Sequence, residues 1–590
     1  MQDSQVQISS SSQLPIRRWL TTAALVLFGF WLYYPALSLP PSIIDDYVVV
    51  ENADHWVDNL KKRDISTAIS KDLGLALGVY NLGFMLENTF RYRLAGNQPH
   101  HWFRLLQLVF VCGFLFSMVY RLGRKSTWSY VGACAAVMLY LVAEVPGSID
   151  MQSLRANWFR QFTAEPDILM MQAAHIVCIF TLIARRNTRL QSGLLMAAVF
   201  VTGCAIFTLK NPNAASVVFP LLTLALYHLI RRQGRRGFMF FALAVAVACT
   251  AVVYRVALQP FAPVREGHAY GSNFSMQPSH LVEGVLYLAK TFGDVLGPAY
   301  PAITASVIIL VGWLWRRRNQ PEHSLLLPAV LYLATVAIVS VAIYIPWNAR
   351  LPRYFTISIY FISALLGLVL SVGLPVLWAL IKERRLYLGW ILAGAVSVLL
   401  PPWFLWFAAA AAVIISATRH WRAALPYLGG MAAVSAVYIL FTLPVSRNAA
   451  NNYYVGREFA NWHVTLAVMK ASAEGKSVCY AGDVFDEHIG SIAGHINRMG
   501  IQPLLYGIDD ADHCSSSSMI LVNKVLSPPD LQQKYAGLPV VTQYDIPEPE
   551  YKVPVSFETF RQRLLTRPAP PAALTYDVWS LEYAWRLYQQ

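Results

Sequence analysis

Charged residues are scarce in this 590-residue chain. They make up 14% of it, whereas hydrophobic residues make up 56%. A soluble globular protein carries nearer a quarter charged residues, so the scarcity excludes an ordinary soluble protein. The mean hydropathy is +0.43, and the apolar residues come in runs about as long as a bilayer core is thick. The composition therefore predicts an all-α polytopic membrane protein.

Several motifs and patterns are also missing. The chain has no GxxxxGK[ST], HExxH or GxSxG in a usable context, which argues against a nucleotide-driven pump. Its seven cysteines show no CxxC spacing, and those in apolar runs are read as small apolar residues. Cys479 and Cys514 lie in the polar C-terminal part. They are expected to pair only if that part faces an oxidising compartment, which the sequence leaves open.

About thirteen apolar runs of span length follow one another. They cover residues 19–37, 102–120, 128–146, 168–184, 191–209, 214–230, 237–255, 299–315, 324–346, 355–381, 386–400, 402–418 and 424–443. Clusters of Arg and Lys fall on one side if every run crosses once, as cytoplasmic loops require. The net charge of +14 is therefore attributed to topology and not to nucleic-acid binding. The pattern predicts a cytoplasmic N-terminus and a C-terminal part outside, periplasmic in a bacterium.

The chain divides into two predicted parts. Residues 1–446 form the transmembrane part, which includes a long first outer loop over 38–101. Residues 447–590 are expected to form a small C-terminal α/β domain on the outer side. There, "GKSVCYAG", "IQPLLYGI", "SMILVNKV" and "LPVVTQYDI" are typical of short strands, and helical stretches lie between them.

The segment "PPSIIDDYVVV" holds two adjacent acids, Asp45 and Asp46, a few residues after the first apolar run. A pair of this kind is suited to capping the N-terminus of an interfacial helix. It is equally suited to act as a general base or metal ligand, because two close carboxylates perturb each other and leave one poised to take a proton. The residues alone leave both readings open.

Further candidates lie in the other outer segments. Glu165 and Asp167 in "TAEPDIL" are either a solvated loop before a span or a second acidic group facing the first. Lys210 in "FTLKNPNAASVVFP", together with Arg350 and Arg353 in "ARLPRYF", is either an interfacial cation or a ligand of a lipid phosphate.

Taken together, these features resemble the GT-C superfamily of integral-membrane glycosyltransferases. The resemblance is carried by the acid pair in the first outer loop, the ExD in the second, "LKNPNAASVVFP", "RLPRYF" and the outer C-terminal domain. The superfamily includes protein O-mannosyltransferases, aminoarabinose transferases and arabinosyltransferases. The Asp-Asp form is more similar to the arabinosyltransferase branch, and pilin arabinosyltransferases are members that the pattern allows.

The resemblance implies an inverting enzyme of the bacterial inner membrane. It would transfer a monosaccharide, such as the pentose arabinose, from a polyprenyl-phosphate donor to a hydroxyl of a glycan, lipid or protein such as pilin. Asp45, the first acid of the pair, is expected to be the base, with Arg353, Lys210 or Arg350 on the phosphate. No cofactor is required, although the acids leave room for a divalent cation. The alternatives are a secondary transporter or flippase, and an O-antigen ligase or polymerase.

Overall fold

A computed structural model of the chain describes two groups of residues. The helical group covers 101–142, 164–184, 187–258, 275–296, 299–320, 324–347, 355–383, 386–397, 402–417 and 426–431. The C-terminal group covers 465–481, 500–507, 519–523, 529–535, 537–544 and 585–589. A few isolated positions are described between these ranges and in the N-terminal hundred residues.

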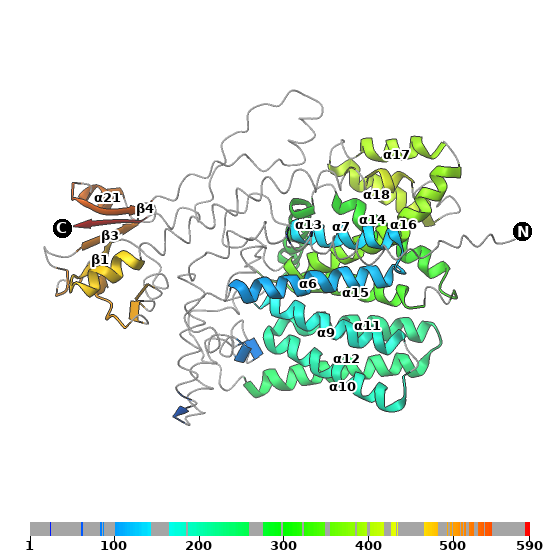
Figure 1. Ribbon diagram of the computed structural model, residues 1–590, viewed down its shortest axis with the longest axis horizontal. Helices are drawn as coiled ribbons and strands as arrows, with labels where there is room; N and C mark the ends of the chain where they lie inside the picture. Colours follow the sequence, from blue (N-terminus) through cyan, green and yellow to red (C-terminus); the bar gives the residue numbers. More distant parts are fainter. Residues whose placement is uncertain are drawn as a thin grey trace, which may run out of the picture.

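The helical group is a bundle of long apolar helices, drawn in blue to yellow-green in Figure 1. Its apolar helices are α6 (His101–Leu122), α7 (Thr127–Val142), α9 (Glu165–Ala184), α10 (Arg189–Leu209), α11 (Ala215–Ile230), α12 (Gly234–Leu258), α14 (Ala299–Arg316), α15 (Leu326–Ala342), α16 (Thr356–Glu383), α17 (Leu386–Ser397) and α18 (Pro402–Ala417). Each coincides with a predicted apolar run. Among the described residues, 6 helices are long and apolar enough to cross a membrane, so this is a multi-pass membrane protein. The predicted total of thirteen spans stays a prediction.

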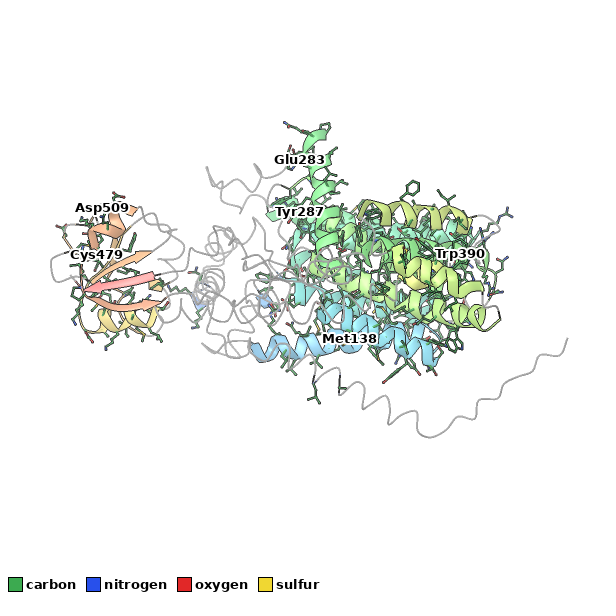
Figure 2. All side chains as sticks on the ribbon, turned by 90° about the horizontal axis from the view of Figure 1, so that it is seen from above. Met138, Glu283, Tyr287, Trp390, Cys479 and Asp509 are labelled. Carbon is green, nitrogen blue, oxygen red and sulfur yellow. A yellow bond between two sulfur atoms is a disulfide. The ribbon has the colours of Figure 1, made fainter. Side chains whose placement is uncertain are left out.

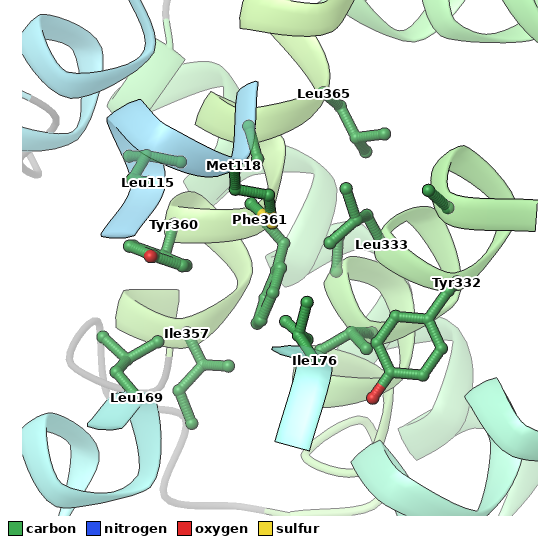
Figure 3. Packing of buried hydrophobic residues seen from close by; sticks show 14 of the residues in the cluster. Leu115, Met118, Leu169, Ile176, Tyr332, Leu333, Ile357, Tyr360, Phe361 and Leu365 are labelled. Carbon is green, nitrogen blue, oxygen red and sulfur yellow. The ribbon is translucent and has the colours of Figure 1, made fainter. Parts of the chain in front are cut away.

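The bundle core is made of aliphatic and aromatic side chains from helices far apart in sequence. Figure 3 shows Met118 of α6, Ile176 of α9, Leu333 of α15 and Phe361 of α16 meeting there. The hydroxyl of Tyr360 donates a hydrogen bond of 3.0 Å to a backbone carbonyl of α6. That bond satisfies a polar group which would be costly to bury alone.

Helices α7 and α16 approach each other closely. A Cβ added at Gly132 of α7 would collide with the carbonyl oxygen of Gly367 in α16. Only glycine allows the two backbones to come so near, which is the usual way in which helices gain contact inside a bilayer. This contact fixes α16 beside α6 and α7, and so fixes the start of α16.

Two turns rich in basic residues lie at one end of the bundle. Arg124 and Lys125 occupy the turn after α6, and Arg231 and Arg232 occupy the turn between α11 and α12. The other end, where α6 and α9 begin and α10 ends, is called the site end here. With a rise of about 1.5 Å per residue, a 22-residue helix separates the two ends by about 33 Å.

One helix was not predicted. Helix α13 (Pro278–Leu296) lies within the outer segment 256–298, where the sequence analysis expected no span and proposed no helix. Its chain is amphipathic, unlike the uniformly apolar spans. A short 3₁₀ turn, η3 (Asn211–Ala214), joins α10 to α11 at the site end.

The C-terminal group contains a five-stranded mixed sheet in the order β2-β1-β3-β5-β4. The strands are β1 (Val478–Ala481), β2 (Leu505–Gly507), β3 (Met519–Asn523), β4 (Val540–Tyr544) and β5 (Trp585–Gln589), with helix α21 (Pro529–Tyr535) before β4. Strand β1 pairs in parallel with β2 and β3, and β5 pairs antiparallel with β3 and β4. Strands β1 to β4 lie within the four predicted stretches. Strand β5 was not predicted.

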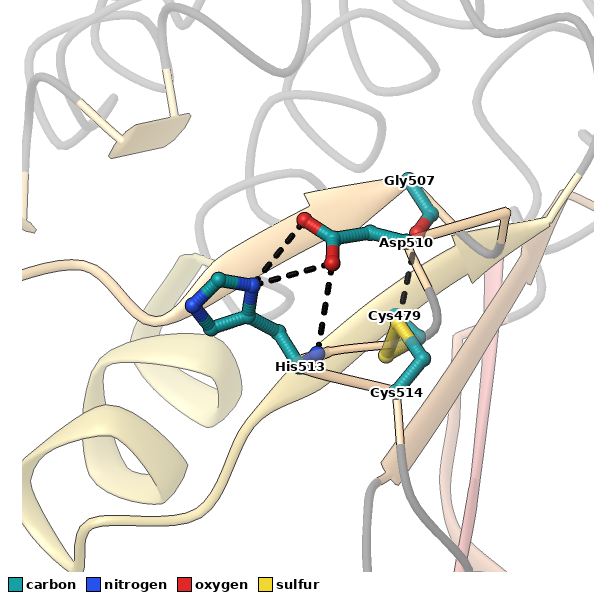
Figure 4. A network of polar contacts seen from close by, with 5 residues as sticks. All are labelled: Cys479, Gly507, Asp510, His513 and Cys514. Atoms are coloured by element: carbon teal, nitrogen blue, oxygen red, sulfur yellow. Dashed lines mark hydrogen bonds and ion pairs between the residues drawn. A yellow bond between two sulfur atoms is a disulfide. The ribbon is translucent and has the colours of Figure 1, made fainter.

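A disulfide joins Cys479 of β1 to Cys514 in the connection between β2 and β3. The neighbouring His513 places Nδ1 at 2.9 and 3.0 Å from the two carboxylate oxygens of Asp510, and its backbone N–H donates to the same carboxylate (Figure 4). These bonds from His513 lower the pKa of Asp510 below its usual value. The connection after β2 is thus held against β1 by a covalent bond and a polar cluster.

The disulfide leads to a prediction about the side on which the C-terminus lies. Structural disulfides persist in oxidising compartments, and the basic turns favour the same assignment of sides. Alkaline phosphatase fused after Gln590 is expected to be active, and β-galactosidase fused there inactive. Alkylation of the unreduced protein should leave Cys479 and Cys514 unmodified. A fusion with the opposite activities would contradict the predicted orientation.

Candidate functional site

Glu165 and Asp167 form the first turn of α9. The sequence analysis expected them in an outer loop, but Pro166 begins the helix because its fixed φ suits the first turn. Both carboxylates also gain from the positive end of the helix dipole. The residues are 2% and 4% exposed, which rules out the solvated-loop reading. Two residues apart on a helix, they point in opposite directions around its axis.

Glu165 pairs with Lys210. The Nζ atom of Lys210 lies 2.6 Å from Oε1 of Glu165, and both side chains are 3% exposed. Lys210 directly follows the last residue of α10 in an extended conformation, with φ −154° and ψ 114°. Its ammonium also lies 5.6 Å from the centre of the Tyr344 ring, just beyond α15. This pair ties the start of α9 to the end of α10.

Asp167 pairs with Arg104 in the first turn of α6. One guanidinium nitrogen of Arg104 donates to both carboxylate oxygens, at 3.0 and 3.1 Å. The same nitrogen donates to the side-chain carbonyl of Gln107 at 2.8 Å, and the amide of Gln107 donates to Asp167 at 2.7 Å. Three side chains from two helices therefore close a small buried network.

Two buried ion pairs at one end of a bundle are unusual on energetic grounds. Removing a charge from water costs several kcal/mol, and the attraction between partners repays this only with good geometry and further hydrogen bonds. Buried ionisable residues in membrane proteins are rare and commonly functional for this reason. The Glu165–Lys210 and Asp167–Arg104 pairs, called the charge cluster here, are thus the strongest site candidate among the described residues.

Asn213 adds an unsatisfied amide next to the charge cluster. Its backbone N–H donates to the carbonyl of Lys210 at 3.0 Å, and its side chain is 1% exposed. Within the described part of the chain, neither the nitrogen nor the oxygen of this amide has a hydrogen-bond partner. Leaving a buried polar group unmatched costs about 1–3 kcal/mol. Residues with such an unmet requirement call for a functional explanation.

The predicted site residues have different outcomes. Glu165, Asp167 and Lys210 are described, and the structure brings Glu165 and Lys210 into direct contact. Asp45, Asp46, Arg350 and Arg353 lie outside the described residues, so their proposed roles stay predictions. The described residues contain no group of three or more metal-ligating side chains that could hold a metal ion, and a divalent cation stays untested.

Sequence reasoning missed Arg104, Gln107 and Tyr344. Arg104 gave a usable signal, because it lies at the end of its span opposite to the basic turns. A cation at that end is not explained by the positive-inside rule. Gln107 follows Arg104 by three residues and therefore shares its helix face. Tyr344 gave no distinguishing signal, since aromatic residues are common at span ends.

The network around Asp167 leads to a stability prediction. Arg104→Met leaves Asp167 as an uncompensated buried charge, which should lower the free energy of unfolding by about 3–5 kcal/mol. Arg104→Met combined with Asp167→Leu removes both charges and should recover most of that loss. Thermal unfolding in detergent or nanodiscs measures both. Equal destabilisation by the single and the double variant would contradict this account.

These observations define a polytopic helical membrane protein with a buried charge cluster at one end of its bundle. No family model matches the sequence, and no curated protein matches it. Among solved structures the chain is similar to ArnT from Cupriavidus metallidurans. The likeness is to the form bound to undecaprenyl phosphate (14% identity, TM-score 0.44, 90% of this chain and 97% of that chain) and to the apo form (13%, 0.44, 90% and 96%).

It is also similar to the Archaeoglobus fulgidus oligosaccharyltransferase in its apo form, at 10% identity and a TM-score of 0.39 over 92% of this chain and 68% of that one. ArnT and the archaeal oligosaccharyltransferase are GT-C glycosyltransferases, the class that the sequence motifs resemble. At TM-scores below 0.5 the likeness does not establish a function, so the function below rests on the chain's own residues.

Proposed function

We propose that this protein is a glycosyltransferase of the GT-C type. It transfers a monosaccharide from a polyprenyl-phosphate donor to an acceptor hydroxyl at the outer face of the bacterial inner membrane. The observation that carries the proposal is the charge cluster, with the Glu165–Lys210 pair at 2.6 Å and the Asp167–Arg104 pair at 3.0 Å. It lies at the site end, opposite to the basic turns, where the headgroup of a lipid-linked donor would lie.

The proposed chemistry assigns the proton and the leaving group to separate residues. The carboxylate of Asp45 takes the proton of the acceptor hydroxyl, and the oxygen forms a bond to the anomeric carbon. The bond from that carbon to the phosphate oxygen breaks on the opposite face, which inverts the anomeric centre. Polyprenyl phosphate leaves with the electron pair, and a cation offsets its growing negative charge.

Arg353 and Arg350 have a stronger claim to the phosphate than Lys210. The ammonium of Lys210 already lies 2.6 Å from Glu165, and a phosphate would have to share it with that carboxylate. Arginine presents a forked set of donors that matches phosphate. Lys210 then contributes by holding positive charge close to the site, while the nearby Asn213 amide offers both a donor and an acceptor to a sugar hydroxyl.

The position of the charge cluster weighs against the transporter alternative. Transporters usually hold coupling residues near the middle of the bilayer, often at interrupted helices. Here Arg104, Glu165 and Asp167 lie in the first turns of helices, and Lys210 directly follows α10. Charges at the helix ends suit a substrate whose headgroup stays at the interface.

The function is tested by what the chain adds to the cell envelope. Glycans, lipids and pilins from cells with the gene, without it, and with an Asp45→Asn variant are compared by mass spectrometry. We expect one monosaccharide mass to be present only with the wild-type gene, and a pentose mass would support an arabinosyl donor. Identical envelopes in all three strains would overturn the proposal.

Arg353 carries a prediction about the donor. A charge-assisted hydrogen bond to phosphate contributes about 1.5–3 kcal/mol, which is about ten- to a hundredfold in affinity. Arg353→Ala is expected to lower the affinity for the donor by that factor. Arg353→Lys should lower it by a smaller factor, because lysine lacks the forked geometry. Titration of an undecaprenyl-phosphate sugar against the purified variants measures this. If Arg353→Ala binds the donor with wild-type affinity, the phosphate must be bound by Arg350 or Lys210 instead.

A further inference from the structure

Helix α13 has three distinct faces. Gly284, Leu288 and Phe292 share one face, and Gly284 and Phe292 are buried on it. Successive residues of a helix are 100° apart, so Val282, Val285, Leu286 and Ala289 form a second, adjacent stripe. All four members of that stripe are exposed.

The first face packs on the bundle at the site end. A Cβ added at Gly284 would collide with the carbonyl oxygen of Ile345, just beyond α15. Further along, the ring of Phe292 lies 5.0 Å from that of Phe355 and 5.1 Å from that of Tyr300. Ile345 directly follows Tyr344, whose ring faces Lys210. Helix α13 is therefore anchored one residue away from the charge cluster.

The second face is apolar and uncovered. Val282, Val285 and Leu286 are 59%, 52% and 64% exposed. The third face is polar, and the Glu283 side chain on it is 67% exposed. A helix in water gains nothing from a separate apolar stripe of this size, whereas a helix at a membrane interface requires one apolar and one polar face.

The direction of α13 agrees with this reading. Figure 2 shows the helix running away from the side of the bundle, across the direction of the spans, with Glu283 farther out than Tyr287. The spans carry a belt of exposed apolar side chains, which includes Phe110 of α6, Val201 of α10 and Val256 of α12. In a membrane protein such a belt faces lipid hydrocarbon.

We propose that α13 lies in the plane of the membrane interface at the site end, with Val282, Val285 and Leu286 against lipid hydrocarbon and Glu283 toward water. The partner is the bilayer itself. The proposal does not depend on the proposed reaction. If that reaction is correct, α13 additionally forms the membrane-side wall beside the charge cluster, where a lipid-held substrate would approach.

Spin labels on α13 test the proposal. Single cysteines are introduced by Val285→Cys and Leu286→Cys on the apolar stripe, and by Glu283→Cys on the polar face as a matched control. The five free cysteines are first replaced by alanine, and Cys479 and Cys514 are kept as a disulfide. Each variant is placed in phospholipid vesicles and labelled with a nitroxide.

Accessibility to oxygen, which partitions into lipid, is then compared with accessibility to a water-soluble nickel chelate. Labels at 285 and 286 are expected to favour oxygen, and a label at 283 the chelate. A preference for the chelate at all three positions would show that α13 is surrounded by water and would overturn the proposal. Exclusion of both reagents at 285 and 286 would also overturn it, because protein would then cover the stripe. Neither outcome bears on catalysis, so the proposed function is tested separately.

Discussion

Asp45→Asn is expected to reduce glycosyl transfer by about 10²–10⁴-fold, because that is the usual contribution of a positioned general base. Asparagine keeps the size of aspartate, but its uncharged amide does not accept the proton. The protein should still insert and unfold at the wild-type temperature, since a change from carboxylate to amide at this position removes no apolar contact. Transfer from an undecaprenyl-phosphate sugar, measured with purified protein, gives the rate.

The controls for this result lie in the same outer loop. Asp46→Asn is expected to reduce transfer as well, because the second acid sets the proton affinity of the first. Asp64→Asn changes an acid of the same loop outside the pair and should leave the rate near the wild-type value. Wild-type turnover by both Asp45→Asn and Asp46→Asn would contradict a catalytic role for the two acids and would favour the alternative that they cap a helix.

Lys210→Met should strongly destabilise the protein. It removes the ammonium that lies 2.6 Å from the buried carboxylate of Glu165, whose side chain is 3% exposed. Breaking a buried pair in this way costs about 3–5 kcal/mol. Glu165→Gln alone removes the carboxylate from the same pair and should cost a similar amount. Thermal unfolding of both variants measures the loss.

The double variant separates structure from function. Lys210→Met with Glu165→Gln removes both charges, so the loss of stability should be much smaller than the sum of the single losses. If the pair has the proposed role near the donor phosphate, the double variant folds but transfers sugar at least tenfold more slowly. A double variant that is both stable and fully active would mean that the pair only joins α9 to α10.

The apolar spans could be predicted from the sequence, but the partners of the charged residues could not. The length and hydropathy of the apolar runs 191–209 and 214–230 can be read directly from the sequence. The helices α10 and α11 match these runs to within a few residues. The contact between Glu165 and Lys210 joins residues 45 positions apart. Its geometry depends on how α9 and α10 pack, and no local pattern encodes that packing.

Glu165 and Asp167 were correctly predicted at the start of a span, but they are buried in the first turn of α9 and not in a solvated loop. A proline disfavours helical structure in the residue before it but also suits the first turn of a helix, and Pro166 lies in the first turn of α9. Both readings follow from the fixed φ of proline, and burial by neighbouring helices decided between them. Helix α13 is amphipathic and not uniformly apolar, so a criterion based on long apolar runs does not detect it.

Helix α15 is shorter than the bilayer it crosses. It has 17 residues, so at about 1.5 Å per residue it extends about 26 Å, against a hydrocarbon thickness of about 30 Å. It presents side chains such as Ile338 outward. Such hydrophobic mismatch draws the bilayer thinner beside a short span. Since α15 ends close to Tyr344, whose ring faces Lys210, lipid headgroups drawn inward there would bring their phosphates toward the buried charges.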